Sequence, residues 1–342
     1  MPTAAVREPS SFSSTAEGFQ PSPVRGYLYI GAAAMLWAVS ATLGRAVFTG
    51  RMTLLGARVP LVPPLMLAQS RTTFAVLVLF PLLAAARGAG SLRMKPRELL
   101  DCTLFGTLGI AASNFFYYLA IQRTNVATAI ILQYLAPVFV LFWMLGRGLQ
   151  KPTLARIAGV AAAVAGCVLA VGVVGRTAHF PWLGIAPGSM LLDHLGVAAA
   201  LTAAVAFAFY NVFGSHLMES HDRWTVQAWA LGAAGAGWLF VNPPWRIVAA
   251  HYSGAQWTFM AIFSVTSTLL PFSFYFAGLH HLDATRAIVT GCLEPVFSIL
   301  VAAAVLGEMV GPVQIAGIVL VLLSTLLVQM GAGKSGALEA ME

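Results

Sequence analysis

One acidic residue, Glu294, stands inside a long apolar stretch and directly precedes Pro295. A charge at the centre of a membrane helix costs about 2.5–3.5 kcal/mol on the insertion scale. Proline lacks a backbone N–H, so Pro295 also frees a carbonyl one helical turn earlier. Two roles fit Glu294. It is either a coupling group that binds protons or balances a cationic substrate, or a structural group that bonds backbone amides of a neighbouring helix.

Polar and aromatic side chains also recur on single faces of the apolar stretches. Trp37 and Ser40 share one face of the first stretch, and Tyr210 and Asn211 lie on the corresponding face of the sixth. Hydroxyl groups beside aromatic rings suit a solute with a flat or partly apolar body, although small and hydroxyl residues also favour close helix packing. The predicted substrate-binding residues are Trp37, Ser40, Asn114, Tyr117, Gln133, Tyr210, Asn211, Ser267, Tyr275 and Glu294.

Two other charged residues are better explained structurally. Arg71, near the start of its span, could bind a substrate carboxylate, but long side chains near helix ends can extend to the membrane interface, and we favour that interpretation. Glu308 follows Leu306-Gly307 at a helix end and is predicted to be an interfacial cap.

The remaining reactive residue types do not form a recognisable site. His280 and His281, with Asp283, are predicted to lie in a solvated loop rather than to hold a metal. The three cysteines are widely separated and show no CxxC pattern, so we expect them to be packing residues. The sequence thus predicts no metal, no cofactor and no catalytic residue.

The composition indicates a membrane protein. Of 342 residues, 59% are hydrophobic and only 9% are charged, whereas soluble domains carry roughly 25% charged residues. A spanning helix needs about 20 apolar residues. Hydropathy predicts an all-α integral membrane protein whose ten spans cover residues 26–48, 64–86, 102–122, 125–146, 154–173, 195–217, 223–243, 256–279, 284–306 and 311–330.

Charge then predicts the orientation. Twelve of the 19 basic residues fall on the side of the N-terminus, six fall on the opposite side, and Arg71 falls within a span. The positive-inside rule therefore places both termini in the cytoplasm. The polar segments 1–25 and 331–342 are predicted to be cytoplasmic tails, the first of them disordered. Because the basic residues cluster in short loops, we do not expect nucleic-acid binding.

The chain contains an internal repeat. A shift of 158 residues places Tyr117 on Tyr275, Pro137 on Pro295 and Gly159 on Gly317. A repeat of five spans, an odd number, must enter the membrane in opposite orientations in its two copies. We therefore predict two inverted repeats, residues 26–173 and 195–330, joined by a loop at 174–194. Inverted repeats of this kind occur in many secondary transporters, whose substrate site lies near the midplane of the membrane between the two copies.

The repeats resemble a known family. The segments 117–169 and 275–327 are similar to the two EamA domains of the drug/metabolite transporter superfamily. The second copy carries Glu294-Pro295-Val296-Phe297 and Leu306-Gly307-Glu308. The first has Ala136 in place of Glu294 and Gln150 in place of Glu308. The resemblance implies ten helices around a central cavity and alternating access without ATP.

These observations lead to a functional expectation. The chain is predicted to be a gradient-driven transporter in the plasma membrane, an exporter of amino acids or related metabolites. A transporter of nucleobases or cationic drugs is the nearest alternative. A membrane-embedded enzyme is the alternative from another class, but motifs such as HExxH and GxSxG are missing from the sequence. The expected partners are a small-molecule substrate and the lipid bilayer, with the chain acting as a monomer or homodimer.

Overall fold

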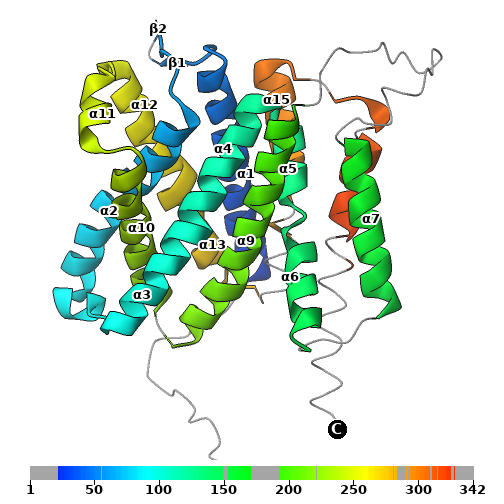
Figure 1. Ribbon diagram of the computed structural model, residues 1–342, viewed down its shortest axis with the longest axis horizontal. Helices are drawn as coiled ribbons and strands as arrows, with labels where there is room; N and C mark the ends of the chain where they lie inside the picture. Colours follow the sequence, from blue (N-terminus) through cyan, green and yellow to red (C-terminus); the bar gives the residue numbers. More distant parts are fainter. Residues whose placement is uncertain are drawn as a thin grey trace, which may run out of the picture.

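The structure is a computed structural model that is almost entirely helical (Figure 1). It describes residues 22–54, 56–148, 153–170, 193–220, 222–279, 281–282, 290–291, 293–308, 310–313, 315–324 and 327. The first half contains α1 (Pro23–Phe48), β1 (Thr53–Leu54), β2 (Ala57–Arg58), α2 (Pro64–Arg87), η1 (Ala89–Leu92), α3 (Pro96–Leu104), η2 (Phe105–Ala111), α4 (Ala112–Arg123), α5 (Val126–Gln133), α6 (Ala136–Gly146) and α7 (Leu154–Ala170). The second half contains α9 (His194–Ser220), α10 (Arg223–Val241), α11 (Pro244–Ala249), α12 (Gly254–Ser264), η4 (Val265–Leu269), α13 (Leu270–Leu279) and α15 (Leu293–Leu306). Residues 315–324 are helical as well.

Within the described residues, six helical segments are long and apolar enough to cross a membrane. They are Pro23–Phe48, Pro64–Arg87, Pro96–Arg123, Val126–Gly146, His194–Gly214 and Gly254–Tyr275. Shorter apolar helices cover Ile157–Gly166, Leu293–Leu306 and Ile315–Ser324. The predicted helical membrane class is thus confirmed, with one small exception: β1 and β2 form a short antiparallel hairpin between α1 and α2. The number of ten spans stays a prediction.

Helix starts follow local sequence signals. The Asn125 side chain accepts a hydrogen bond from the Thr128 amide at the start of α5, at 2.7 Å. Ser253 and Gln256 form a reciprocal capping box at the start of α12. Such caps satisfy backbone amides that have no partner within the helix, and they therefore favour the observed starts of α5 and α12.

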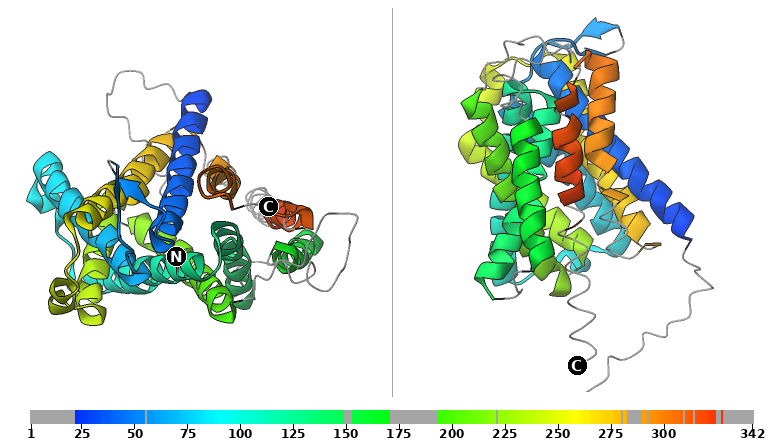
Figure 2. Two further views of the ribbon diagram at one scale, coloured as in Figure 1. Left: turned by 90° about the horizontal axis from the view of Figure 1, so that it is seen from above. Right: turned by 90° about the vertical axis from the view of Figure 1, so that its right-hand side faces the viewer.

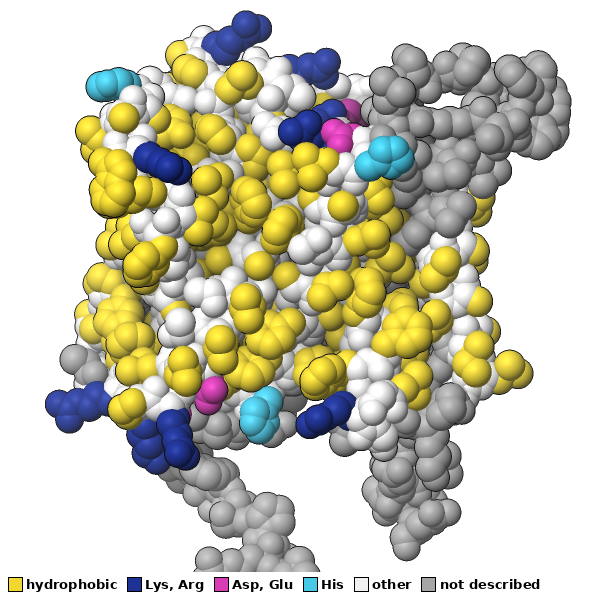
Figure 3. All heavy atoms as spheres, in the orientation of Figure 1, with side chains coloured by type: hydrophobic (Ala, Val, Ile, Leu, Met, Phe, Trp, Pro, Cys, Tyr) yellow, Lys and Arg dark blue, Asp and Glu magenta, His cyan; other side chains and the backbone are white. Residues whose placement is uncertain are grey.

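The helices form a bundle in which α1 packs between α13 and α15, and α4 packs along α9 (Figures 1 and 2). At one side, α7 lies against the helical segment 315–324. A Cβ added to Gly166 would come within 2.8 Å of the Gly317 carbonyl oxygen, so the two backbones touch. Small residues allow this close approach in membranes. On the face drawn in Figure 3, apolar side chains cover the middle and most Lys and Arg side chains lie at the two ends.

The 158-residue register recurs in the backbone. The π-helical segment η2 covers Phe105–Ala111, which the shift carries onto residues 263–269, and the second π-helical segment, η4, covers Val265–Leu269. The helical path between α5 and α6 is interrupted at Tyr134 and Leu135, shortly before Pro137. π-helical turns are rare and concentrate at functional sites, so their equivalent placement indicates a shared design of the two halves.

Candidate functional site

Arg71 on α2 lies at the centre of a polar cluster inside the bundle. Its Nε donates to Thr268 Oγ1 at 2.7 Å and its Nη2 to the Ser267 carbonyl at 2.7 Å. Its Nη1 donates to Asn114 Oδ1 at 2.9 Å and to the Tyr118 hydroxyl at 2.8 Å. Our expectation that Arg71 extends to the membrane interface is therefore wrong. Neutral acceptors from α4 and η4 solvate the guanidinium group inside the protein, so it has no need to reach water.

These contacts make Arg71 a structural link between three elements. Four of the five guanidinium N–H groups have an acceptor, and the Ser264 hydroxyl donates to the Arg71 carbonyl at 2.8 Å. All four acceptors are neutral, so the positive charge is not balanced by a direct ion pair among the described residues. Glu294 lies close enough for the two charges to interact.

Glu294 lies in the first turn of α15. The Tyr134 hydroxyl lies 3.2 Å from Glu294 Oε2 and 3.3 Å from the Gly291 carbonyl oxygen. The Gly291 carbonyl is the one that Pro295 deprives of a helical donor, and Tyr134 has taken that role. A hydroxyl has one proton, so at any moment it can serve only one of the two acceptors. Across the described ranges no backbone amide of a neighbouring helix reaches Glu294.

Two buried hydroxyl groups near Glu294, Tyr117 Oη and Ser298 Oγ, have no hydrogen-bond partner among the described residues. Tyr117 is 8% exposed and Ser298 is fully buried. Tyr117 on α4 lies within the electrostatic reach of Glu294. Ser298 follows Glu294 by four residues and so shares its face of α15. Unsatisfied buried hydroxyls are uncommon in folded proteins and need an explanation.

The structure places several of the predicted residues around Arg71 and Glu294. Asn114 and Ser267 both bind Arg71, whereas Tyr117 lies near Glu294. Gln133 on α5 donates to the Ser113 hydroxyl of α4 at 3.3 Å. These residues, with Arg71, make up the polar centre between α2, α4, α5, η4 and α15.

The other predicted residues lie on α1, α9 and α13. Trp37 packs against Tyr275, with ring centroids 5.8 Å apart, and Tyr210 stacks on Phe105 at 4.9 Å. The hydroxyl of Ser40 and the side-chain amide of Asn211 each donate to a carbonyl of their own helix. Tyr210 lies within the electrostatic reach of Tyr275 and Arg71, so these aromatic residues border the polar centre.

Sequence reasoning missed four contributors: Tyr118, Thr268, Tyr134 and Ser298. Helical spacing could have found Ser298, four residues after Glu294. It could not have found Thr268, because the π turn of η4 breaks the usual period of 3.6 residues. Tyr134 lies in the interruption between α5 and α6, where no helical face is defined.

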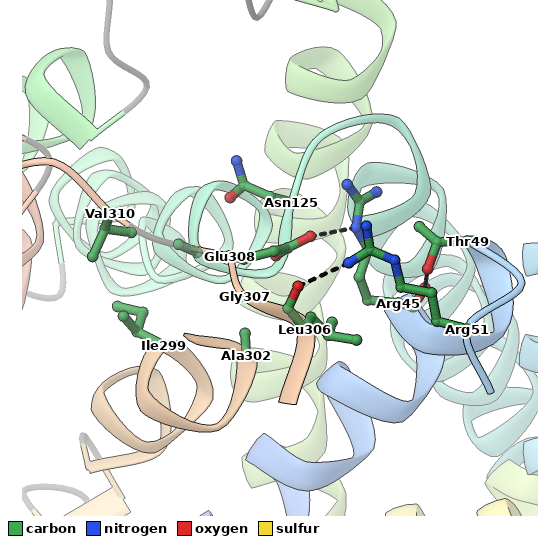
Figure 4. A pocket seen from close by; sticks show the side chains of 11 residues that line it. Arg45, Thr49, Arg51, Asn125, Ile299, Ala302, Leu306, Gly307, Glu308 and Val310 are labelled. Carbon is green, nitrogen blue, oxygen red and sulfur yellow. Dashed lines mark hydrogen bonds and ion pairs between the residues drawn. The ribbon is translucent and has the colours of Figure 1, made fainter. Parts of the chain in front are cut away.

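A pocket of about 370 Å³ lies where the ends of α1 and α15 meet (Figure 4). Its lining includes Arg45, Thr49 and Arg51 from the first half, and Leu306 and Glu308 from the second. Arg45 Nε donates to Glu308 Oε1 at 2.6 Å, and the two side chains are only 15% and 21% exposed. Arg51 donates to the Leu306 carbonyl at 2.8 Å.

The Arg45–Glu308 ion pair also satisfies two helix ends. Arg45 donates to the carbonyls of Ile121 and Gln122 at the end of α4, at 2.8 and 3.0 Å. Glu308 Oε2 accepts from the Val126 amide at the start of α5, at 3.3 Å. A cation at a helix C-terminus and an anion at a helix N-terminus both interact favourably with the helix dipole. The contact agrees with the predicted role of Glu308 as a cap.

The predicted histidine loop is described only in part. The His281 ring stacks on Tyr29 at 5.9 Å and accepts from the Ser22 amide at 3.4 Å. His280 and Asp283 lie outside the described residues. Cys102 is buried, as a packing cysteine should be.

A family model decides the assignment. The model described as the EamA-like transporter family matches residues 24–172 and again residues 194–330. The chain belongs to the EamA-like transporter family. Like other EamA-like proteins it is a membrane transporter, and the expected resemblance is confirmed.

Similar EamA-like relatives occur in distant organisms. The chain is 24% identical over 236 residues to the uncharacterized inner membrane transporter YicL of Salmonella typhimurium, a match that covers 68% of this chain and 74% of the relative. It is 25% identical over 233 residues to an uncharacterized transporter of Archaeoglobus fulgidus, covering 68% and 76%. A solved crystal structure aligns with a TM-score of 0.58 at 20% identity over 92% of this chain and 99% of the other, a likeness in fold.

Proposed function

We propose that this chain is a gradient-driven exporter of amino acids or related metabolites in the plasma membrane. One observation carries the proposal. The interior of the bundle holds a cation and a carboxylate, Arg71 and Glu294, that are near enough to interact. In the described structure each is bonded only to neutral groups. Charges inside a membrane are costly and mark substrate or ion pathways, and a site with both signs of charge can accept a zwitterionic solute such as an amino acid.

The proposed architecture is ten spans in two inverted repeats, residues 26–173 and 195–330. The equivalent π-helical segments and the interruption before Pro137 support a common plan for the halves. Because the polar centre contains residues of both halves, relative movement of the halves would expose it alternately to the two sides.

The proposed orientation has both termini in the cytoplasm. The Arg45–Glu308 pocket then faces outward, and its ion pair holds the outer ends of α1 and α15 together in this conformation. A reporter that is active only outside the cytoplasm should stay silent when fused after Met330 and be active within residues 174–194. The reverse pattern would contradict the orientation and leave the fold untouched.

The mechanism assigns proton coupling to Glu294. Purified protein in proteoliposomes, given a panel of amino acids and an imposed pH gradient, should accumulate at least one of them. Glu294→Gln should insert and fold yet lose the accumulation that the pH gradient drives. Asp101→Asn, at an end of the bundle, is the control and should behave as wild type.

Two results would contradict the proposal. Full pH-driven accumulation by a stable Glu294→Gln variant would end the coupling role. Chemical conversion of the loaded solute would favour an enzyme, and accumulation of a nucleobase in place of all amino acids would change the substrate class.

A further inference from the structure

We infer that Glu294, Tyr117, Tyr134 and Ser298 form a subsite for a protonated amino group, so that the transported solute must carry an ammonium group and need not carry a carboxylate. The inference rests on the proposed function and names the chemistry of its substrate. The hydrogen-bonding capacity of the four side chains carries it.

The first step concerns acceptors. The Gly291 carbonyl, freed by Pro295, and Glu294 Oε2 both face the Tyr134 hydroxyl, which has one proton to donate. One of these two acceptors therefore always lacks a hydrogen bond from Tyr134. Glu294 Oε1 adds another acceptor, to which no described residue donates. The site is thus rich in acceptors and carries a negative charge.

The second step concerns the unpartnered hydroxyls. Tyr117 Oη and Ser298 Oγ are buried, and no described residue is a hydrogen-bond partner of either. Each oxygen has two lone pairs and can accept a hydrogen bond. Tyr117 belongs to α4 and Ser298 to α15, the helix of Glu294. Groups left unsatisfied in the unliganded protein cost stability there, and a ligand that satisfies them recovers that cost on binding.

The third step selects the ligand. An ammonium group has a positive charge, three N–H donors and no acceptor, which complements a carboxylate surrounded by carbonyl and hydroxyl oxygens. A ligand carboxylate placed here would meet the charge of Glu294. Hydrogen bonds between oppositely charged groups are about twice as strong as neutral ones. The subsite therefore discriminates on charge as well as on geometry.

Arg71 explains why the carboxylate of the solute is dispensable. Its guanidinium group already donates to Thr268, Asn114, Tyr118 and Ser267. Counting contacts with described residues, one of its five N–H groups is left without an acceptor. One N–H group is too few for the two-point contact by which arginine binds a carboxylate. Arg71 thus contributes a positive field to the solute rather than a specific carboxylate site.

The test compares three forms of one solute skeleton. The probes are leucine, 3-methylbutylamine, which lacks the carboxylate, and N-acetyl-leucine, which lacks the ammonium group; the same three forms of phenylalanine cover a larger side chain. Binding is measured on the purified full chain by the rise in melting temperature with probe concentration. Leucine or phenylalanine and the matching amine should both bind, and the acetylated form should not.

Variants connect the binding to the subsite. Glu294→Gln should weaken amine binding about ten- to hundredfold, as expected for a charged hydrogen bond, and Asp101→Asn should leave it unchanged. Ser298→Ala should raise the melting temperature of the unliganded protein, because a buried unsatisfied hydroxyl is removed, and yet weaken amine binding. A serine with only a structural role would not combine a higher melting temperature with weaker amine binding when it is replaced by alanine.

The outcomes separate the two proposals. Binding of the acetylated forms as tight as that of the free amino acids, or no binding by any probe, overturns the inference. Amine binding that survives Glu294→Gln overturns it as well. Amine-dependent binding without transport of any amino acid in proteoliposomes would support the subsite and reject the proposed export function.

Discussion

The helix α15 has a carboxylate near each end, and the two differ in almost every respect. Glu308, just beyond its end, has a direct arginine partner and a backbone amide. Glu294, in its first turn, has one shared hydroxyl and two unpartnered hydroxyls nearby. From Glu294 to the end of α15 at Leu306 the helix rises by about 18 Å. A carboxylate with all its partners in place holds the fold together, whereas one left short of partners is available for a ligand.

The largest expected effect concerns the Arg45–Glu308 pair. Arg45→Ala leaves the carboxylate of Glu308 and the carbonyls of Ile121 and Gln122 without their partner. Because both charged side chains are mostly buried, we expect the free energy of unfolding to fall by about 2–4 kcal/mol. Thermal or denaturant unfolding in detergent measures it.

An exposed ion pair supplies the control for Arg45→Ala. Arg87 and Asp222 are 43% and 44% exposed, and Arg87→Ala should cost no more than about 1 kcal/mol. If the two variants lost equal free energy of unfolding, the Arg45–Glu308 pair would stabilise the fold no more than an exposed ion pair does.

Arg71 offers an intermediate test. Like Glu294 it is charged and partly buried, but like Glu308 it has nearly all of its hydrogen-bond partners. Arg71→Lys keeps the charge but loses the planar fork, and a lysine has three donors for four acceptors. We expect a loss of about 1–2 kcal/mol in the free energy of unfolding, with solute affinity changed less than by Glu294→Gln. An affinity loss as large as that of Glu294→Gln, without loss of stability, would instead assign Arg71 to direct solute binding.

The smallest expected effect on stability belongs to Glu294 itself. Glu294→Gln removes a partly buried charge and leaves an amide oxygen that can still accept from Tyr134. The free energy of unfolding should therefore change by less than about 1 kcal/mol. Thermal unfolding of the variant, followed beside wild type, checks this. A loss as large as that of Arg45→Ala would erase the difference between the two carboxylates and make Glu294 a structural residue.

The sequence predicted the features that depend on composition and local rules. Apolar stretches of helical length predicted a helical membrane protein, and equal spacing of Tyr117, Pro137 and Gly159 with their partners predicted the repeat. The missing N–H of Pro295 predicted a free carbonyl one turn earlier, and that carbonyl is Gly291, bound by Tyr134. These properties follow from the chemistry of single residues and their near neighbours, so no knowledge of packing was needed.

Only the tertiary structure decided which residues meet. Arg45 and Glu308 are 263 residues apart, and nothing in either segment indicates the other. Arg71 turned inward because α4 and η4 present acceptors at the right positions, a matter of helix packing and of a π turn that changes the helical period. Whether a charge in a membrane is a structural anchor or a binding group depends on how many partners surround it. The number of partners is set by elements distant in sequence. Glu308 and Glu294 therefore have different roles although both are glutamates close to the ends of one helix.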